Sequence, residues 1–243
     1  IDRGVWGGGE ESGPTRVNVM EYITIASTGN TTDFGDLSVT RDRNSACASS
    51  TRGCFQGGGT GSYSNVIDYI TIASTGNATD FGNLTIARQE LGGTSNETRG
   101  IAFGGNDGTA RNTIDYITIA SAGNSADFGD TTSACNAGSG TSSTTRGVLG
   151  LGSVGGVSDT IEYITIASAG NSTDFGNLSA AKAQFATASS NTRGLFAGSS
   201  GFINVIEYIT IASTGNTTDF GDLTVARGYL EGTSNKTRAV FGG

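Results

Sequence analysis

Two oppositely charged residues recur with fixed sequence neighbours and are the first candidates for chemistry. Each aspartate is followed by Phe-Gly, and each arginine follows a threonine. The aspartates are Asp33, Asp80, Asp127, Asp174 and Asp219, and the arginines are Arg52, Arg99, Arg146, Arg193 and Arg238. An arginine–carboxylate pair fixes geometry more than it adds net stability. We therefore predict that the two sets pair between structural units and serve the architecture rather than a reaction.

The residue types that catalysis commonly needs are poorly represented. Histidine is absent, which removes the usual general base and the commonest zinc ligand. Without histidine, no serine can be singled out as a nucleophile. The tripeptide Asp-Phe-Gly also occurs in protein kinases, but the other motifs of a kinase are missing here. Asn30, Asp33 and Asp36 offer oxygen atoms to Ca²⁺, but the second unit has Asn83 in the last place. We expect no enzyme activity, no catalytic residue, no metal and no cofactor.

The charge balance argues against two classes of partner. The net charge is −8, and the cations are 12 arginines and only two lysines. An acidic surface of this kind does not favour nucleic acid or an anionic membrane, and no apolar run is long enough for membrane insertion. Of the three cysteines, Cys47 and Cys54 flank a predicted hairpin turn. They either pair across it or, like Cys135, are small buried hydrophobic residues.

The chain consists of five near-copies of one unit, each marked by the phrase Tyr-Ile-Thr-Ile-Ala-Ser. The tyrosines are Tyr22, Tyr69, Tyr116, Tyr163 and Tyr208, so the steps are 47, 47, 47 and 45 residues. Such a period is typical of a modular array. In one unit we expect four short strands, named a to d: residues 85–95, 99–105, 113–121 and 125–130. Strand c has large apolar residues on both faces, so the sheets must be covered on both sides. This pattern predicts an all-β fold, a five-bladed β-propeller of four-stranded antiparallel blades, as a single domain over residues 1–243.

The repeated wording also carries a family resemblance. A glycine doublet after strand b (Gly104-Gly105), the strand-c tyrosine and the element Phe81-Gly-Asn-Leu84 resemble the kelch repeat. The longer phrase is similar to kelch-type repeats in structural proteins, of the tail or appendage, of marine tailed bacteriophages. The resemblance implies a propeller and a virion or extracellular location. The doublet is weakened to Gly150-Leu-Gly152 and Ala197-Gly198 in the fourth and fifth copies.

Differences between the copies predict where binding occurs. The distance from each tyrosine to the next Thr-Arg arginine is always 30 residues, so the length changes fall in the b–c connections. The second variable zone follows strand d. Both emerge at the same end of an up-and-down blade, and variable loops on one face of a repeat protein often form the binding face. Neutral drift of exposed loops is the alternative. The candidate ligand- or partner-binding residues are Tyr63, Asp107, Arg111, Phe202 and Tyr229.

Strand b is present six times, whereas the other strands are present five times each. Residues 3–9 and 238–243 both have its pattern. We expect a ring that closes by placing the last strand a, within residues 225–236, beside the first strand b. Three accounts of the surplus strand remain open: the chain is an excerpt of a longer array, one copy frays, or the strand pairs with a neighbouring molecule.

These observations favour a non-enzymatic structural or attachment protein of a phage virion or an extracellular filament. Its expected partners are further copies of itself and a cell-surface receptor or glycan. The alternative is a carbohydrate-binding propeller that uses the variable loop face. An enzyme of the galactose-oxidase type ranks third, because the copper site of such an enzyme needs histidine and this chain has none.

Overall fold

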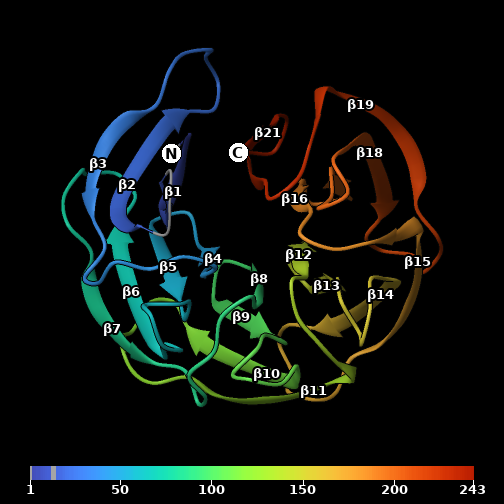
Figure 1. Ribbon diagram of the computed structural model, residues 1–243, viewed down its shortest axis with the longest axis horizontal. Coiled ribbons are helices and arrows are strands. Elements are labelled where there is room, and N and C mark those ends of the chain that lie inside the picture. The colour runs from blue at the N-terminus through green and yellow to red at the C-terminus, as the bar shows by residue number, and fades with distance from the viewer. Residues whose placement is uncertain (1, 12–14) are drawn as a thin grey trace.

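The computed structural model describes residues 2–11 and 15–243, and every regular element in them is a β-strand. The strands form antiparallel sheets arranged as the blades of a propeller around a central axis (Figure 1). This confirms the predicted five-bladed fold, with four blades of four strands and one of three.

The sheets follow one another along the chain. Blade 1 contains β1 (Arg3–Glu10), β2 (Arg16–Thr24) and β3 (Thr32–Asp36). Blade 2 contains β4 (Ser45–Ala48), β5 (Arg52–Gln56), β6 (Val66–Thr71) and β7 (Thr79–Asn83). Blade 3 contains β8 (Gly92–Ser95), β9 (Arg99–Phe103), β10 (Arg111–Thr118) and β11 (Ala126–Cys135). Blade 4 contains β12 (Ser139–Ser142), β13 (Arg146–Gly150), β14 (Ser158–Thr165) and β15 (Thr173–Lys182). Blade 5 contains β16 (Ala186–Ser189), β17 (Arg193–Ala197), β18 (Ile203–Thr210) and β19 (Thr218–Arg227).

A sixth, two-stranded sheet consists of β20 (Glu231–Ser234) and β21 (Ala239–Gly242). We call it the half-blade. It lies between blade 5 and blade 1, near the axis, where the blue and red ends of the ribbon approach each other (Figure 1).

The predicted closure of the ring is wrong. The last strand a, β20, pairs with β21 and not with β1. Both copies of strand b are paired, β1 with β2 and β21 with β20, so neither is frayed. The two copies have nearly the same sequence, and β21 follows β20 after a short turn. β21 therefore pairs with β20, since the short turn between them costs less entropy to close than the long segment that separates β1 from β20.

The hydrophobic core is divided among the interfaces between blades. Four buried clusters each join two consecutive blades, from blades 1 and 2 to blades 4 and 5. Between blades 1 and 2, for example, Met20, Phe34 and Leu37 pack against Phe55 and Ile70. Both faces of strand c are therefore covered, as its sequence predicts.

The repeated Gly-Asn of the c–d turn clamps each of blades 2 to 5 to the blade before it. The Gly76 N–H donates to the carbonyl of Phe34 at 2.7 Å, and the side-chain oxygen of Asn77 accepts from the Asp36 N–H at 3.0 Å. The same asparagine bond recurs in later blades through Asn124, Asn171 and Asn216. A Cβ on Gly35 would lie 2.5 Å from the Gly76 oxygen, so this contact also requires glycine on strand d.

Candidate functional site

The repeated arginines bind tyrosines and carbonyl groups, which corrects the predicted arginine–aspartate pairing. The Arg52 guanidinium carbon lies 4.2 Å from the ring centroid of Tyr69 in the same blade, and Arg52 donates to the Ile119 carbonyl of the next blade at 2.8 Å. The same stacking places Arg3 on Tyr22, Arg99 on Tyr116, Arg146 on Tyr163 and Arg193 on Tyr208. The same reach to a carbonyl of the following blade is made by Arg3, Arg99, Arg146 and Arg238.

The aspartates of Asp-Phe-Gly remain exposed on the outer strand of each blade. Asp33, Asp80, Asp127, Asp174 and Asp219 are all exposed, and among the described residues no ion pair joins them to the repeated arginines. The physical reason is solvation. A carboxylate in water keeps its hydration, whereas the guanidinium gains an aromatic face and a carbonyl in a partly buried position.

A different set of ion pairs is buried between the blades. Arg41 pairs with Asp68 at 2.6 Å and Arg88 with Asp115 at 2.9 Å, and neither side chain of either pair is more than 1% exposed. Lys182 pairs with Glu207 in the same way. In each case a cation at the end of strand d or beyond it meets the acid that precedes the strand-c tyrosine of the next blade. The signal was in the sequence, because this acid recurs in every copy beside the tyrosine.

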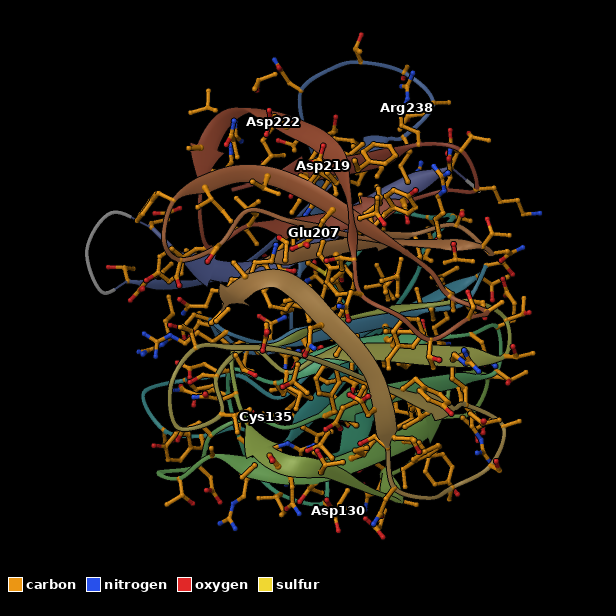
Figure 2. The ribbon with its side chains drawn as sticks, turned by 90° about the vertical axis from the view of Figure 1, so that its right-hand side faces the viewer. Asp130, Cys135, Glu207, Asp219, Asp222 and Arg238 are labelled. Carbon is orange, nitrogen blue, oxygen red and sulfur yellow. The ribbon has the colours of Figure 1, made fainter. Side chains whose placement is uncertain are left out.

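Cys135 takes the place of the cation in the third copy. It is buried, and burial raises the pKa of its thiol to about 12, so it carries no charge at neutral pH. The matching acid, Glu162, accepts hydrogen bonds from the hydroxyl groups of Thr132 and Ser172. Cys135 and Glu207 mark two of these interfaces at different heights in Figure 2. The interface therefore tolerates loss of the cation when hydroxyl groups satisfy the acid.

Burial and pairing act in opposite directions on the charged partners. Burial lowers the pKa of Arg41, and Asp68 opposes this shift. Burial alone would raise the pKa of Glu207, but hydrogen bonds from Lys182, from Thr217 and from the Ser179 N–H bring the pKa below its usual value. Pairing thus opposes the effect of burial on both Arg41 and Glu207, which fits a structural role.

The two variable zones meet on one face, as expected from the up-and-down topology. Asp42 and Gly59 exchange backbone hydrogen bonds of 3.1 and 2.8 Å, which joins a d–a turn to a b–c loop. Gln89 pairs with Asn106 and Asn136 with Ser153 in the same manner. We call this surface the loop face. The b–c loop of blade 1, residues 10–15, lies partly outside the described residues.

The five candidate binding residues form two separate groups on the loop face. In the first group, Arg111 makes a two-point ion pair with Asp107, at 2.6 and 2.9 Å, and this guanidinium lowers the pKa of Asp107. The hydroxyl group of Tyr63, in the loop of blade 2, lies close to Gly108 in that of blade 3. Tyr63 itself is 41% exposed.

In the second group, Phe202 and Tyr229 contact each other edge to face, with ring centroids 6.3 Å apart. Their side chains are 63% and 62% exposed. Phe202 belongs to the b–c loop of blade 5, and Tyr229 to the turn that leads into the half-blade. The sequence indicated both residues separately but gave no sign that they meet.

Sequence reasoning missed a ring of residues with left-handed backbone. One residue of each d–a turn has a φ between 52° and 59°: Arg43, Glu90, Ala137, Gln184 and Tyr229. Residues other than glycine rarely adopt this conformation. The N–H of each of the middle three donates to the carbonyl of the preceding one, at 2.8 to 2.9 Å. Each of these residues lies two positions before an inner strand, so five different residue types stand at the loop-face ends of β4, β8, β12, β16 and β20.

Three further findings concern metal binding, membrane spans and the cysteines. Within residues 2–11 and 15–243, no cluster of three or more cysteine, aspartate or glutamate side chains is placed to hold a metal ion. In the same residues no helix is long and apolar enough to cross a membrane. Cys47 and Cys54 lie directly opposite each other in β4 and β5, both as buried free thiols.

The fold and the loop face define a β-propeller whose blades are consistent with kelch-like repeats. No protein-family model matches the chain, and a comparison with curated proteins found none that matches it.

Proposed function

We propose that the protein is a non-enzymatic structural or attachment component of a phage virion or of an extracellular filament. The observation that carries this proposal is the contrast between the two ends of the blades. The loop face combines variable loops with exposed aromatic and charged residues, whereas the opposite end repeats the same Gly-Asn clamp. A rigid scaffold with one variable face is suited to recognition.

The direct test is the location of the protein in its source culture. Antibodies raised against the purified chain should decorate virions or extracellular filaments in immunogold electron micrographs. Label confined to the cell interior would contradict the proposal. The control is the same antibody after adsorption with the purified protein, which should remove the label.

A binding test can assign the loop face. Labelled protein should bind cells that carry the receptor, and replacing Phe202 and Tyr229 together by alanine should reduce that binding, since exposed aromatic residues often dominate interfaces. The matched control is Asp80→Asn on an outer strand, which should leave binding unchanged. If the wild type, the double alanine variant and Asp80→Asn bind equally well, Phe202 and Tyr229 do not contribute to receptor binding.

Carbohydrate binding is the second candidate function, and the Phe202–Tyr229 pair is the observation that favours it. Flat exposed rings beside polar loops suit the apolar faces of sugars as well as protein partners. A broad glycan array probed with the labelled chain should then give defined positives that the double alanine variant loses. If no glycan on the array binds the labelled chain, the structural role remains the better proposal.

Self-assembly belongs to the leading proposal, because two strand edges near the half-blade have no partner among the described residues. In that part of the chain β1 pairs only with β2, and β21 only with β20. An open contact of this type propagates into a filament when it does not close on itself. Electron micrographs of concentrated protein that show only single discs would contradict self-assembly.

A further inference from the structure

One dipeptide of the loop face is chemically labile. Aspartate precedes glycine once in the chain, at Asp107-Gly108, and asparagine never precedes glycine. In such a pair the backbone nitrogen of the glycine can attack the side-chain carboxyl carbon, because glycine has no Cβ to hinder the approach. The repeated c–d turns avoid this reactivity, since they have the order Gly-Asn in place of the Asn-Gly that is common in hairpins. Asp107-Gly108 is therefore the one place in the sequence where this chemistry is expected.

The reaction is an isomerisation through a cyclic imide. A bond forms between the Gly108 nitrogen and the side-chain carboxyl carbon of Asp107, and the bond from that carbon to its hydroxyl oxygen breaks. The hydroxyl group leaves as water together with the amide proton. Addition of water to either carbonyl of the ring reopens it, to aspartate or to isoaspartate, so the mass is unchanged but isoaspartate has a main chain one carbon longer. The first step needs a neutral carboxyl group and an available amide nitrogen.

The fold requires the glycine of this dipeptide but not the aspartate. Gly108 has a φ of 111°, and the equivalent glycines of blades 2 and 4, Gly61 and Gly155, have φ values of 99° and 68°. Glycine is the residue that adopts this left-handed backbone readily. The residues before the equivalent glycines are Thr60 and Val154. The aspartate is thus a property of the third copy and not of the loop as such.

The copy that has the aspartate also has an arginine to hold it. The Arg111 Nε donates to one carboxylate oxygen of Asp107 at 2.9 Å, and the Arg111 Nη2 donates to the other at 2.6 Å. Three residues before the strand-c isoleucine, where Arg111 stands, blades 2 and 4 have Ser64 and Ser158. The guanidinium favours the ionised carboxylate and lowers the pKa of Asp107. The neutral form that the reaction needs is therefore scarce.

The nitrogen of the glycine is engaged as well. The Gly108 N–H donates to the side-chain oxygen of Asn106 at 2.7 Å. The loop is anchored at its end, where the Arg111 N–H donates to the Gly105 carbonyl at 2.9 Å. In blade 2 the residue at the place of Asn106 is Gly59, which has no side-chain oxygen to offer. Both reacting groups of the third copy are therefore held by neighbouring residues.

We infer that Asp107-Gly108 is an isomerisation site that the ion pair with Arg111 keeps inactive. Loss of the pair makes the carboxyl group available for protonation and leads to isoaspartate at residue 107. The product lengthens the main chain of the b–c loop of blade 3 by one carbon, on the loop face. Arg111 thereby determines how long this loop keeps its native covalent structure. This chemistry requires no receptor, glycan or virion.

The test measures isoaspartate in the full chain and in a free peptide of residues 101–114 during incubation for several weeks. Enzymatic methyl transfer to isoaspartyl groups gives the amount, and tandem mass spectrometry gives the position. The free peptide should isomerise at residue 107. The folded wild type should do so at least about tenfold more slowly, because a close cation typically lowers the neutral fraction of a carboxyl group by that factor or more.

Two substitutions of the arginine examine the ion pair directly. Arg111→Gln should raise the rate at residue 107 about tenfold, and Arg111→Lys, which keeps the charge but not the two-point geometry, should give an intermediate rate. The pKa of Asp107 is below its ordinary 3.8 in the wild type. The ratio of the rates of Arg111→Gln and wild type should therefore be constant well above pH 3.8 and approach one as the pH falls through 3.8 and through the lower, paired value.

Thr60→Asp provides a matched variant in blade 2. It places aspartate before Gly61 in a turn of the same form, in which the first N–H donates to the carbonyl two residues later, at 2.9 Å for Thr60 and 3.3 Å for Asp107. Ser64 stands where Arg111 does, so the introduced aspartate has no arginine at this position. It should isomerise at least about tenfold faster than Asp107 of the same molecule. Thr60 is exposed, so the variant should fold normally.

Arg43→Gln removes another exposed arginine of the loop face and should leave the rate at residue 107 unchanged. Circular dichroism shows whether each protein is folded. Three results would overturn the inference: isomerisation of the wild type as fast as the peptide, the same rate in Arg111→Gln as in the wild type, or an aspartate at position 60 that reacts as slowly as Asp107. The last result would mean that the loop backbone, and not the ion pair, prevents the reaction.

Discussion

The buried pair of Arg88 and Asp115 gives the sharpest test of how the blades are held together. Asp115 accepts from Arg88 at 2.9 Å, and Thr85 adds a hydroxyl bond of 2.6 Å and an N–H bond of 3.3 Å. Asp115→Ala removes the carboxylate and leaves the fully buried guanidinium without its counter-charge. Breaking such a pair on one side costs about 3–5 kcal/mol. For a chain of this length the melting temperature should fall by roughly 6–20 °C.

The double variant Arg88→Met with Asp115→Leu distinguishes the cost of an orphaned charge from the value of the pair. Replacing both partners by apolar residues of similar volume is often neutral or stabilising, so its free energy of unfolding should lie within about 1 kcal/mol of wild type. Urea unfolding followed by circular dichroism measures all three proteins. The reasoning is refuted if Asp115→Ala is as stable as wild type, or if the double variant is as unstable as the single one.

Three further perturbations test other contacts. Tyr116→Leu should lower the free energy of unfolding by about 1–2 kcal/mol because it removes the aromatic face under Arg99, whereas Tyr116→Phe should retain most of the stability. Gly129→Ala places a Cβ 2.6 Å from backbone atoms of the next blade at a φ of 144°, and should cost more than about 1 kcal/mol in urea unfolding. The pKa of Glu207 is lower in the folded protein than its ordinary 4.5. Its stabilising contribution is therefore present above pH 4.5 and is lost as the pH falls through the lower, folded value.

The controls for these three are available in the same chain. Gly123→Ala meets no atom within 4 Å and should unfold like wild type. If Gly123→Ala and Gly129→Ala are equally stable, the close contact of Gly129 with the next blade does not reduce the stability of the Gly129→Ala variant, and the reasoning is wrong. For the pH effect, Glu207→Gln should be less stable than wild type at neutral pH, and the difference should shrink as the pH falls below about 4.5. A difference that stays constant down to pH 2 would contradict the assigned shift.

The sequence was sufficient for the blade architecture because the same pattern recurs in every unit. The strand-c tyrosines set the spacing, and the two-faced apolar pattern around them required covered sheets. The meeting of the b–c loops and d–a turns also followed, since it depends only on an up-and-down strand order. These features are local or periodic, and both properties can be read without coordinates.

The remaining features depend on choices between competing partners. The sequence offers Arg52 three kinds of partner: an aspartate, a tyrosine and a backbone carbonyl. Only the burial of each group in the folded protein decides which of them it contacts. Ring closure depended on whether β1 or β21 pairs with β20, and the two have nearly the same residues. The left-handed turn residues, such as Glu90 and Gln184, were hidden because no glycine marks them.

The interblade clamp has a consequence for how the repeat number changes. The four interfaces between consecutive blades, from blades 1 and 2 to blades 4 and 5, are joined by the same contacts, from the Gly-Asn turn to the arginine that reaches a carbonyl. Duplication or loss of one whole unit by unequal recombination therefore preserves each contact and alters only the curvature of the ring. The step between Tyr163 and Tyr208 is 45 residues, two fewer than the other steps. The shortening lies outside the constant tyrosine-to-arginine interval of 30 residues, so it leaves the contacts of that interval unchanged. Copy number is thus a variable of this architecture that evolution can change without redesigning any interface.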